Sequence, residues 1–531
     1  MASRSRALTF GLLGLAGAVL LVHSLAYNFV TDDAYISFVF SRNFAEHGQL
    51  VFNLGQPVEG YTNFLWTLVL GIGMLVGIPP EISSRVLGVL CALGTLYLAF
   101  RVTSRAFGER DPWATLPALL LACSAGFACW TSGGLETQLF AMLVTWALDC
   151  VIAAIDEPRA FRRIGIALAL AAMTRPEGLL VAVVLGGVHL GVRLAAWWPV
   201  RGRIAWRDEW IAKAYFLALW GPWFAWRLWY YGYWAPNTYY VKAHGPWASP
   251  GLATQMWHKG VYYVWVWLLQ SGFLYAVPIA LLAFMAPRRS PRFVLAAACW
   301  ALIIVYLVYA ISVGGDFMGL HRFIMPVFVA AAILVALGLE WLSRRAGLGG
   351  WAARAVVVLF ACAQFFVTRH ALDTRDLRND HDLIDTPAFL IMYTEDRATI
   401  GRAMEPCFLP DDFSIVGGAG AQPYFGRMRG IDVFGLVSEK IAHDEPRIRA
   451  RSGHTKFGND DLLASYDPTF VFSCYDIRKD SAQPHLPCAD FWLRRGYEEV
   501  TMHIPGMRER GEYYTFLAKK ARSFQCPGRV H

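Results

Sequence analysis

The sequence predicts a polytopic α-helical membrane protein followed by a soluble α/β domain. Of its 531 residues 56% are hydrophobic and only 17% are charged, a composition typical of membrane proteins. Apolar runs of about 20 residues, long enough to cross about 30 Å of hydrocarbon, recur from Leu8 to Val367. From about residue 369 the chain is rich in Asp, Arg, Gly and Pro. We therefore expect a membrane domain over 1–368 and one soluble domain over 369–531.

The membrane domain is expected to cross the bilayer about eleven times. A twelfth apolar stretch, Tyr61–Gly77, is expected to lie along or dip into the interface. Counting it as a crossing would reverse the orientation of everything downstream, whereas the interfacial placement puts all the span-flanking arginine clusters on one side. The expected spans lie near 8–27, 83–103, 113–130, 136–155, 161–175, 178–194, 210–230, 265–286, 292–311, 322–340 and 351–368.

Arginines set the orientation. With this assignment about eighteen arginines flank the spans on one side, which the positive-inside rule makes cytoplasmic. The first loop, 28–82, and the soluble domain then lie outside. The same arginines explain the net charge of +8, so we expect no nucleic-acid partner. An Arg-rich, Lys-poor composition without Asn-x-Ser/Thr sites favours a bacterial inner membrane, with the outer side periplasmic. The arginines are Arg4, Arg6, Arg101, Arg105, Arg110, Arg159, Arg162, Arg163, Arg193, Arg201, Arg203, Arg207, Arg288, Arg289, Arg292, Arg344, Arg345 and Arg354.

The N-terminus has two interpretations. Arg4 and Arg6 precede an apolar run that ends in Ser24-Leu25-Ala26, which resembles a signal-peptidase site. The run is longer than a usual signal-peptide core, so we expect the first span to be retained.

The soluble domain contains short β-like runs at Phe413–Gly417, Phe470–Cys474 and Tyr513–Leu517, separated by turn-rich segments. These predict a small α/β or α+β unit. Its four cysteines can form disulfides in three ways, and their spacing lacks the CxxC pattern of a zinc site. They are Cys407, Cys474, Cys488 and Cys526.

Two adjacent carboxylates, Asp32 and Asp33, follow the first span. Ionisable groups beside a bilayer are functional candidates by default. Residues 34–47 predict an amphipathic interfacial helix closed by Gly48, with both carboxylates in its first turn. The alternative is that they only cap the helix and complement its dipole. Neighbouring helical residues point about 100° apart, so we expect one carboxylate to act and the other to support it.

The other outer loops bring polar groups to the same membrane face. For Glu136 and Glu177 the alternative explanation is capping of a helix N-terminus. For Arg175 and Arg322 it is snorkelling at the end of a span. A lipid-linked phosphate at the interface requires cations, and the candidates are Arg175, Lys242, His321 and Arg322. The Tyr-rich and Trp-rich loop 230–259 suits either sugars or an interfacial aromatic belt.

Five motifs together resemble the GT-C fold glycosyltransferases, which use polyprenyl-phosphate sugars. Within that class they are similar to the bacterial branch containing the terminal β-1,2 arabinofuranosyltransferase of mycobacterial arabinan. The resemblance covers nearly all of the membrane domain and is looser over 369–531, where this chain is shorter. The motifs are Asp32-Asp33-Ala34-Tyr35-Ile36-Ser37, Val58-Glu59-Gly60-Tyr61-Thr62-Asn63-Phe64, Gly134-Leu135-Glu136-Thr137, Arg175-Pro176-Glu177-Gly178 and Gly314-Gly315-Asp316-Phe317.

This resemblance implies transfer of a sugar, D-arabinofuranose, from decaprenyl or another polyprenyl phosphate to a hydroxyl of a cell-envelope glycan. Another lipid-linked sugar or a protein acceptor is the alternative. Asp32 is the expected general base, with Asp33 next, and Glu136 is expected to orient acceptor or sugar. No cofactor is expected beyond the donor, and no metal, the alternative being a divalent ion that bridges Asp32 or Asp33 to phosphate. The expected substrate-binding residues are Arg42, Glu59, Tyr61, Asn63, Arg175, Glu177, Tyr239, Lys242, Asp316, His321 and Arg322.

Two other functions fit the sequence less well. A flippase for lipid-linked sugars predicts ionisable residues at mid-membrane depth and symmetry between halves, and the sequence has neither. A scaffold that recruits partners through its soluble domain leaves the loop carboxylates unexplained.

Overall fold

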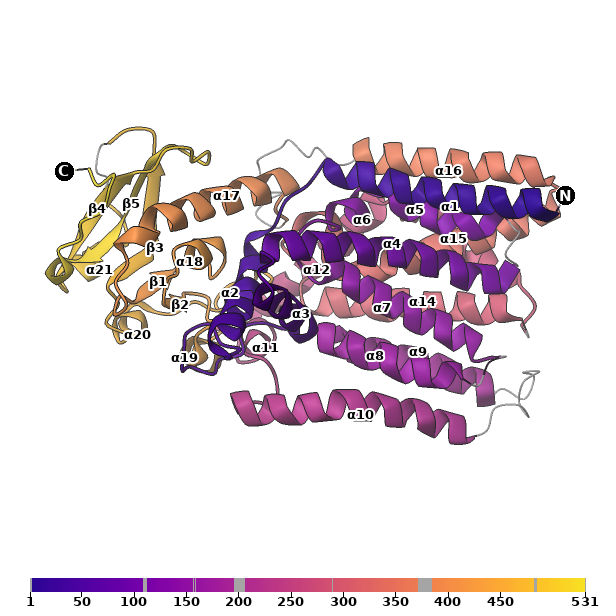
Figure 1. Cartoon of the computed structure of the whole chain (residues 1–531), viewed down its shortest axis with the longest axis horizontal. Coiled ribbons are helices and arrows are strands. Elements are labelled where there is room, and N and C mark those ends of the chain that lie inside the picture. Colours follow the sequence, from indigo (N-terminus) through magenta and orange to yellow (C-terminus); the bar gives the residue numbers. More distant parts are fainter. Residues whose placement is uncertain are drawn as a thin grey trace.

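The computed structural model describes residues 2–107, 112–155, 157, 159–194, 206–288, 290–370, 384–481 and 485–530. A long bundle of roughly parallel and antiparallel helices carries a small α/β domain at one end (Figure 1). The bundle comprises α1 (Ala2–Leu25), α4 (Pro80–Phe107), α5 (Leu116–Cys123), α6 (Ala125–Cys129), α7 (Thr137–Ala153), α8 (Ala160–Thr174), α9 (Glu177–Leu194), α10 (Trp206–Tyr231), α12 (Pro250–Gln270), α13 (Phe273–Leu281), α14 (Pro291–Ser312), α15 (Met325–Arg345) and α16 (Gly350–His370), with 3-10 turns at Pro112–Thr115, Leu282–Met285 and Gly319–Ile324.

Five described helical segments are long and apolar enough to cross a membrane: Ala7–Leu25, Pro80–Phe107, Pro291–Ser312, Gly319–Arg345 and Trp351–Thr368. Counting the bent pair α12–α13 as one span gives six. Each expected span has a helix or a broken helix at its place, and the number eleven stays a prediction.

Two expected spans are interrupted. The span expected near 113–130 is divided at Ser124, which ends α5 and precedes α6. The span expected near 265–286 is divided at Ser271-Gly272, where α12 and α13 meet at 79°. Gly272 has a left-handed φ of 72°, a conformation that glycine adopts without a steric penalty. Hydropathy alone does not reveal such breaks, because apolar residues continue through them.

The first loop folds into α2 (Asp32–His47) and α3 (Phe64–Leu75), which cover the end of the bundle next to the soluble domain (Figure 1). Gly48 closes α2 in the left-handed conformation with φ 70°, as predicted. The expectation that this helix is amphipathic was wrong: Ala34–Asn43 are all buried. Protein surrounds α2, because the soluble domain packs on the side expected to face lipid headgroups.

The soluble domain contains a five-stranded sheet in the order β2-β1-β3-β5-β4. Strands β1 (Ser414–Val416), β2 (Gly430–Asp432) and β3 (Phe470–Arg478) are parallel, and β4 (Tyr497–His503) and β5 (Tyr513–Lys519) are antiparallel neighbours. The three predicted β-runs became β1, β3 and β5. The short β2 and the polar β4 carried no clear pattern. The helices are α17 (Pro387–Met404), α18 (Ala421–Phe425), α19 (Glu439–Asp444), α20 (Asp460–Ala464) and α21 (Asp490–Leu493).

The four cysteines of this domain form Cys407–Cys526 and Cys474–Cys488, which is one of the three pairings that the sequence allowed. The first disulfide ties the C-terminal segment to the end of α17, and the second closes a short loop beside β3.

The soluble domain is joined to the first loop by buried polar contacts. Asn53 donates to the Gly430 carbonyl at 2.8 Å and accepts from the Gly430 N–H at 2.9 Å, so it extends the ladder of β2. Asn237, at the start of α11 (Asn237–Lys242), donates to the carbonyls of Gly435 and Leu436 at 2.7 and 3.0 Å. The boundary expected at 368/369 lies next to residues 371–383, which are outside the described residues.

Helix α1 begins and helix α4 ends at the bundle end opposite the soluble domain (Figure 1), and arginines that set the predicted orientation lie in these two segments. Several form ion pairs there: Arg101 and Arg105 contact the fully buried Asp149 at 3.0 and 2.8 Å, and Arg292 contacts Glu340 at 3.0 Å. Arg110, Arg201, Arg203 and Arg289, with the side chains of Arg4, Arg6 and Arg193, lie outside the described residues.

Candidate active site

Two cavities meet where the bundle, the first loop and the soluble domain come together. The first, here called the Asp32 pocket, has a volume of about 340 Å³ and is lined by Asp32, Asp33, Tyr393 and Arg397 among others. The second, the arginine pocket, has a volume of about 320 Å³. Its polar wall holds Arg175, Lys242 and Arg322, and its apolar wall holds Trp220, Trp223, Phe224 and Phe323. Phe317 lines both cavities, so they are neighbours.

Asp32 is held by the soluble domain. Its Oδ1 accepts a hydrogen bond of 2.8 Å from the backbone N–H of Ala421. The residues before Ala421 are Gly417-Gly418-Ala419-Gly420, which run from the end of β1 to α18. A Cβ on Gly420 would lie 2.3 Å from Asp32 Oδ2. Only glycine therefore allows the backbone of this loop to approach the carboxylate so closely.

Burial raises the pKa of the Asp32 carboxyl to about 6. The hydrogen bond from Ala421 opposes this effect, the negative charge of Asp33 adds to it, and the positive charge of Arg397 opposes it. A carboxylate with this pKa is mostly ionised at neutral pH and is a stronger base than an exposed aspartate, which suits general base catalysis.

Arg397 is a site residue that the sequence analysis missed. It lies in α17 and is 4% exposed. Its Nη2 donates to Tyr475 Oη at 2.8 Å, and its guanidinium lies 4.7 Å from the centre of the Tyr393 ring. Among the described residues its Nε has no hydrogen-bond partner. No local motif marks Arg397, because the fold alone brings α17 next to Asp32.

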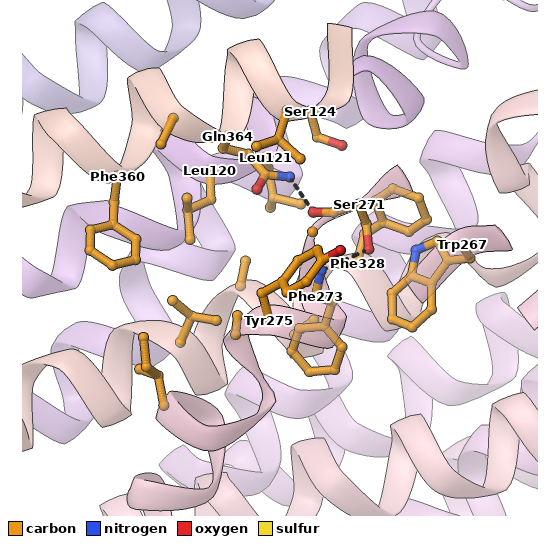
Figure 2. A pocket seen from close by; sticks show the side chains of 18 residues that line it. Leu120, Leu121, Ser124, Trp267, Ser271, Phe273, Tyr275, Phe328, Phe360 and Gln364 are labelled. Carbon is orange, nitrogen blue, oxygen red and sulfur yellow. Dashed lines mark hydrogen bonds between the residues drawn. The ribbon is translucent and has the colours of Figure 1, made fainter. Parts of the chain in front are cut away.

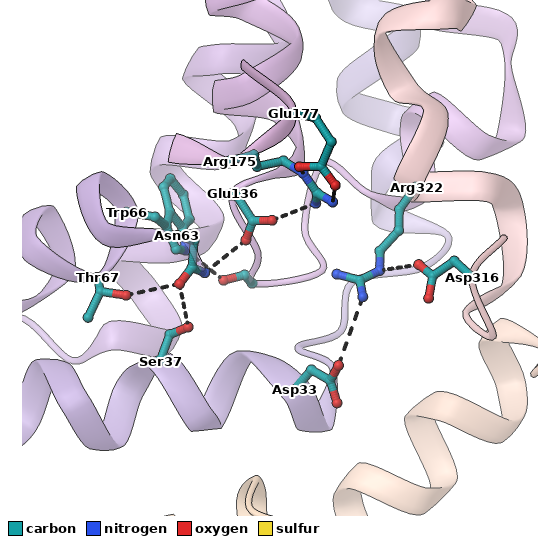
Figure 3. Close-up of polar contacts among 11 residues, drawn as sticks. Asp33, Ser37, Asn63, Trp66, Thr67, Glu136, Arg175, Glu177, Asp316 and Arg322 are labelled. Atoms are coloured by element: carbon teal, nitrogen blue, oxygen red, sulfur yellow. Dashed lines mark hydrogen bonds and ion pairs between the residues drawn. The ribbon is translucent and has the colours of Figure 1, made fainter. Parts of the chain in front are cut away.

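Asp33 lines the Asp32 pocket as well, but its cationic partner, Arg322, lines the arginine pocket. Arg322 Nη2 lies 3.9 Å from Asp33 Oδ2, and Arg322 Nε donates to Asp316 Oδ2 at 2.8 Å (Figure 3). Burial raises the pKa of Asp33, and the nearby cations Arg322 and Lys242 oppose the rise. The two carboxylates, about 100° apart on the helix, have different partners. That one acts and the other supports it stays a prediction.

A second polar network lies behind the arginine pocket (Figure 3). Arg175 donates to Glu136 Oε1 at 2.7 Å and to both carboxylate oxygens of Glu177 at 3.2 and 3.3 Å. Asn63 donates to Glu136 Oε2 at 2.8 Å and accepts from Ser37 at 3.1 Å. Both oxygens of Glu136 are therefore used within the protein. Glu136, expected to orient acceptor or sugar, lines neither cavity and instead fixes Arg175.

The charges of the arginine pocket are largely compensated. Arg175 is surrounded by two glutamates, and Arg322 by two aspartates. Lys242 forms no ion pair with any described residue. Arg322 uses Nε for Asp316 and keeps other N–H groups available. Lys242 and Arg322 are thus better placed than Arg175 to bind an incoming anion.

The structure places four predicted substrate-binding residues outside the linings of both cavities, and one of them is Asn63, which binds Glu136 and Ser37. Arg42 donates to the Tyr424 carbonyl at 2.7 Å and joins α2 to α18. The Tyr61 hydroxyl lies 3.0 Å from that of Tyr231 inside an aromatic cluster. His321 packs against Tyr263 with ring centres 4.8 Å apart, because Leu320 and His321 have left-handed backbone angles that direct the imidazole away from the site.

The other predicted residues lie at the edges of the arginine pocket. Glu59 pairs with the buried Arg227, which also donates to the carbonyls of Tyr233 and Trp234, so this pair organises the turn before α11. Tyr239 lines the pocket and is 47% exposed. Sequence analysis did not identify Arg227, because it lies inside an apolar helix.

A metal was not expected. Within the described residues no three His, Cys, Asp or Glu side chains come together in a metal-binding group. The carboxylates nearest the cavities have other partners: Asp32 binds Ala421, and Asp33 and Asp316 face Arg322. The absence of a metal requirement stays a prediction.

Comparison with known proteins gives one sequence relative and several similar folds. No family model matches the chain. Over 340 residues it is 27% identical to the terminal β-(1→2)-arabinofuranosyltransferase of Mycobacterium tuberculosis, covering 57% of this chain and 51% of that protein. The chain thus spans about half the length of that relative.

Two solved structures are similar along nearly the whole chain. ArnT from Cupriavidus metallidurans, in a crystal structure with undecaprenyl phosphate, has a TM-score of 0.60 and 14% identity, over 95% of this chain and 97% of that one. The oligosaccharyltransferase AglB from Archaeoglobus fulgidus, in complex with an inhibitory peptide and a dolichol-phosphate, has a TM-score of 0.50 and 10% identity, over 97% and 74%. The chain has the GT-C fold of these membrane enzymes.

Proposed function

We propose that this protein is a membrane glycosyltransferase that moves a sugar from a polyprenyl phosphate to a hydroxyl group of a cell-envelope glycan. The observation that carries the proposal is the position of the carboxylate pair. Asp32 and Asp33 line one pocket, which is walled by the soluble domain, and Asp33 also contacts Arg322 of the neighbouring pocket, where cations lie opposite aromatic rings.

The arginine pocket suits the donor. A lipid phosphate needs N–H donors close to an apolar surface, and Lys242 and Arg322 lie in the same cavity as Trp220, Trp223 and Phe323. Charge-assisted hydrogen bonds from these cations would hold the phosphate and stabilise the negative charge that it gains as it leaves. The network of Glu136 and Glu177 would keep Arg175 in a fixed orientation beside them.

The Asp32 pocket suits the acceptor. It lies at the carboxyl ends of the parallel strands β1 and β2, lined by Gly417, Gly418 and Phe434, and open α/β sheets bind ligands at this edge. Aromatic rings suit the apolar faces of sugars. The unpartnered Nε of Arg397 is a hydrogen-bond donor for an acceptor oxygen.

The transfer is then one displacement. Asp32 takes the proton of the acceptor hydroxyl, whose oxygen forms a bond to the anomeric carbon of the donor. The bond from that carbon to the phosphate oxygen breaks, and polyprenyl phosphate leaves toward Lys242 and Arg322. The proton ends on Asp32 and the negative charge on the phosphate.

Similarity to the mycobacterial enzyme supports D-arabinofuranose as the sugar. The arginines at the opposite bundle end support a site on the outer, periplasmic face of an inner membrane. In the decisive experiment the purified protein is incubated with a donor, decaprenyl-phosphoryl arabinofuranose labelled in the sugar, and an acceptor, a synthetic arabinoside. Transfer of the label to the acceptor is measured.

Transfer by the wild type, lost by about 10²- to 10⁴-fold in a folded Asp32→Asn variant, would support both the donor class and the base. If the protein is active only with another polyprenyl-linked sugar, the proposal of a glycosyltransferase stands and the assignment of arabinofuranose is rejected. Loss of transfer in Asp33→Asn but not in Asp32→Asn would move the role of base to Asp33.

A further inference from the structure

A third cavity of about 350 Å³ lies within the helix bundle, away from both pockets of the site. Its walls come from α5, α12, α13, α15 and α16 (Figure 2). The arginine pocket is lined instead by α10 residues, and α10 and α16 lie on opposite sides of the bundle (Figure 1). This cavity is therefore not an extension of the proposed donor site.

The cavity exists because a helix is broken. Where α12 ends at Ser271-Gly272 and α13 turns away by 79°, the bundle leaves a gap. Gln364 Nε2 donates to the Ser271 carbonyl at 3.1 Å and so satisfies one of the carbonyls that the break leaves free. Small side chains line the gap and keep it open: Ala276, Ala331, Ala332 and Ala363.

Two buried polar groups in this cavity lack partners. Ser124 is 3% exposed and Trp267 is 1% exposed. Neither Ser124 Oγ nor Trp267 Nε1 has a hydrogen-bond partner among the described residues. In Figure 2 Trp267 lies beside Ser271, and Phe360 lies at the other end of the cavity. Polar groups inside a membrane protein are expensive to leave unpaired, so these two donors indicate a ligand with an oxygen acceptor.

The lining restricts the class of ligand. No Lys, Arg or His is among the residues that line this cavity, so it does not suit a prenyl phosphate headgroup. A polyprenyl tail has no oxygen that could accept from Trp267 Nε1. An acyl chain of a glycerolipid meets both requirements. Its hydrocarbon fills the apolar part of the cavity, and its ester carbonyl accepts hydrogen bonds.

We propose that this cavity binds one acyl chain of a membrane glycerophospholipid, with the ester carbonyl held by Trp267 Nε1 and Ser124 Oγ. The lipid completes the packing around the break between α12 and α13. This inference does not depend on the proposed transferase activity.

The test compares a diester phosphatidylethanolamine with its diether analogue, which lacks the ester carbonyls. Each lipid is added to the delipidated full-length protein in detergent, and bound lipid is counted by native mass spectrometry. We expect the diester to bind about fivefold more tightly to the wild type, the effect of about one hydrogen bond. In Trp267→Phe that preference should shrink, because the ring stays and one of the two donors is lost.

Ala332→Phe fills the cavity and should lower binding of both lipids. Val183→Phe, at a residue of α9 that is exposed and outside the cavity, is the matched control and should change neither. Ser124→Ala replaces Trp267→Phe if the latter does not fold. Equal binding of diester and diether lipids, unchanged binding in Ala332→Phe, or displacement of the bound lipid by decaprenyl phosphate would overturn the proposal.

Discussion

At the scale of single residues, Asp32 combines the two properties that a buried general base needs. It is desolvated, which raises its pKa, and it keeps one hydrogen bond that stabilises its ionised form. Because the base must be ionised, kcat/KM for the acceptor should fall below about pH 6. The neighbours of Asp32 allow this interpretation to be tested in two directions.

Arg397→Gln removes a cation beside Asp32, so the pKa of Asp32 should rise and the acid limb of the pH profile should move to higher pH. Asp33→Asn removes a neighbouring negative charge, so the same limb should move to lower pH. The measurement is kcat/KM against pH for both variants, with Arg397→Lys as the charge-retaining control. Shifts of the same sign in Arg397→Gln and Asp33→Asn would contradict Asp32 as the titrating base.

The desolvated Asp32 carboxylate should also lower the stability of the folded protein when it is ionised. The pKa of its carboxyl is about 6 in the folded protein and near 3.8 when exposed, so the folded state binds its proton more tightly than the unfolded state. Its contribution to stability is complete below about pH 3.8 and is lost as the pH rises through 6. Asp32→Asn should therefore raise the Tm at pH 8 relative to the wild type by more than it does at pH 4.5. An equal difference at both pH values would show that the carboxyl is not perturbed.

Lys242 is the cation of the arginine pocket that forms no ion pair with a described residue. Lys242→Met should raise the KM for the lipid-linked donor by about 10- to 100-fold, the usual effect of losing a hydrogen bond to a charged group, with a smaller change in the KM for the acceptor. Lys440→Met, whose side chain lies over Tyr466 in the soluble domain, is the control and should leave both constants unchanged. An effect confined to the acceptor would place the phosphate elsewhere.

At the scale of elements, the loop between β1 and α18 is the part of the soluble domain that reaches the reacting carboxylate. Gly420→Ala would place a Cβ 2.3 Å from Asp32 Oδ2, so the loop must withdraw and its Ala421 hydrogen bond must lengthen. We expect kcat to fall by about tenfold or more while donor binding is retained. Gly251→Ala is the matched control, because its added Cβ meets no atom within 4 Å and Gly251 lines neither cavity. Equal kcat values for the two variants would show that this loop does not position Asp32 for catalysis.

Some of the helices and strands could be predicted from the sequence, and others could not. The helix after Asp32 and its Gly48 end follow from local signals, and so do β1, β3 and β5. The breaks at Ser124 and Gly272 do not, because each involves only one to three polar or glycine residues inside a longer apolar run.

At the scale of the whole molecule, the orientation in the membrane is a prediction from the arginines. Single cysteines at Ser481 in the soluble domain and at Arg345 at the end of α15 are both exposed positions. In intact cells with a permeabilised outer membrane, an impermeant maleimide should label the protein with Ser481→Cys and not that with Arg345→Cys. The reverse labelling pattern would invert the topology and place the site in the cytoplasm.

The site shows how far a sequence can be interpreted without the fold. Asp33 and Arg322 were predicted from their loops, and the fold brings them together. Arg397 could not be found, because its role depends on how α17 docks against α2. Tyr61 and His321 were predicted from their neighbours in the chain, but the direction of a side chain depends on backbone angles and packing that motifs do not encode.

The hydrogen bond from Ala421 to Asp32 joins residues 389 positions apart. During synthesis the carboxylate leaves the ribosome early and the amide that holds it emerges near the end. The helices of the bundle can therefore assemble before this contact exists, and a chain that stops before β1 would leave Asp32 without its hydrogen bond from Ala421. Formation of this hydrogen bond thus reports that the soluble domain has folded against the first loop.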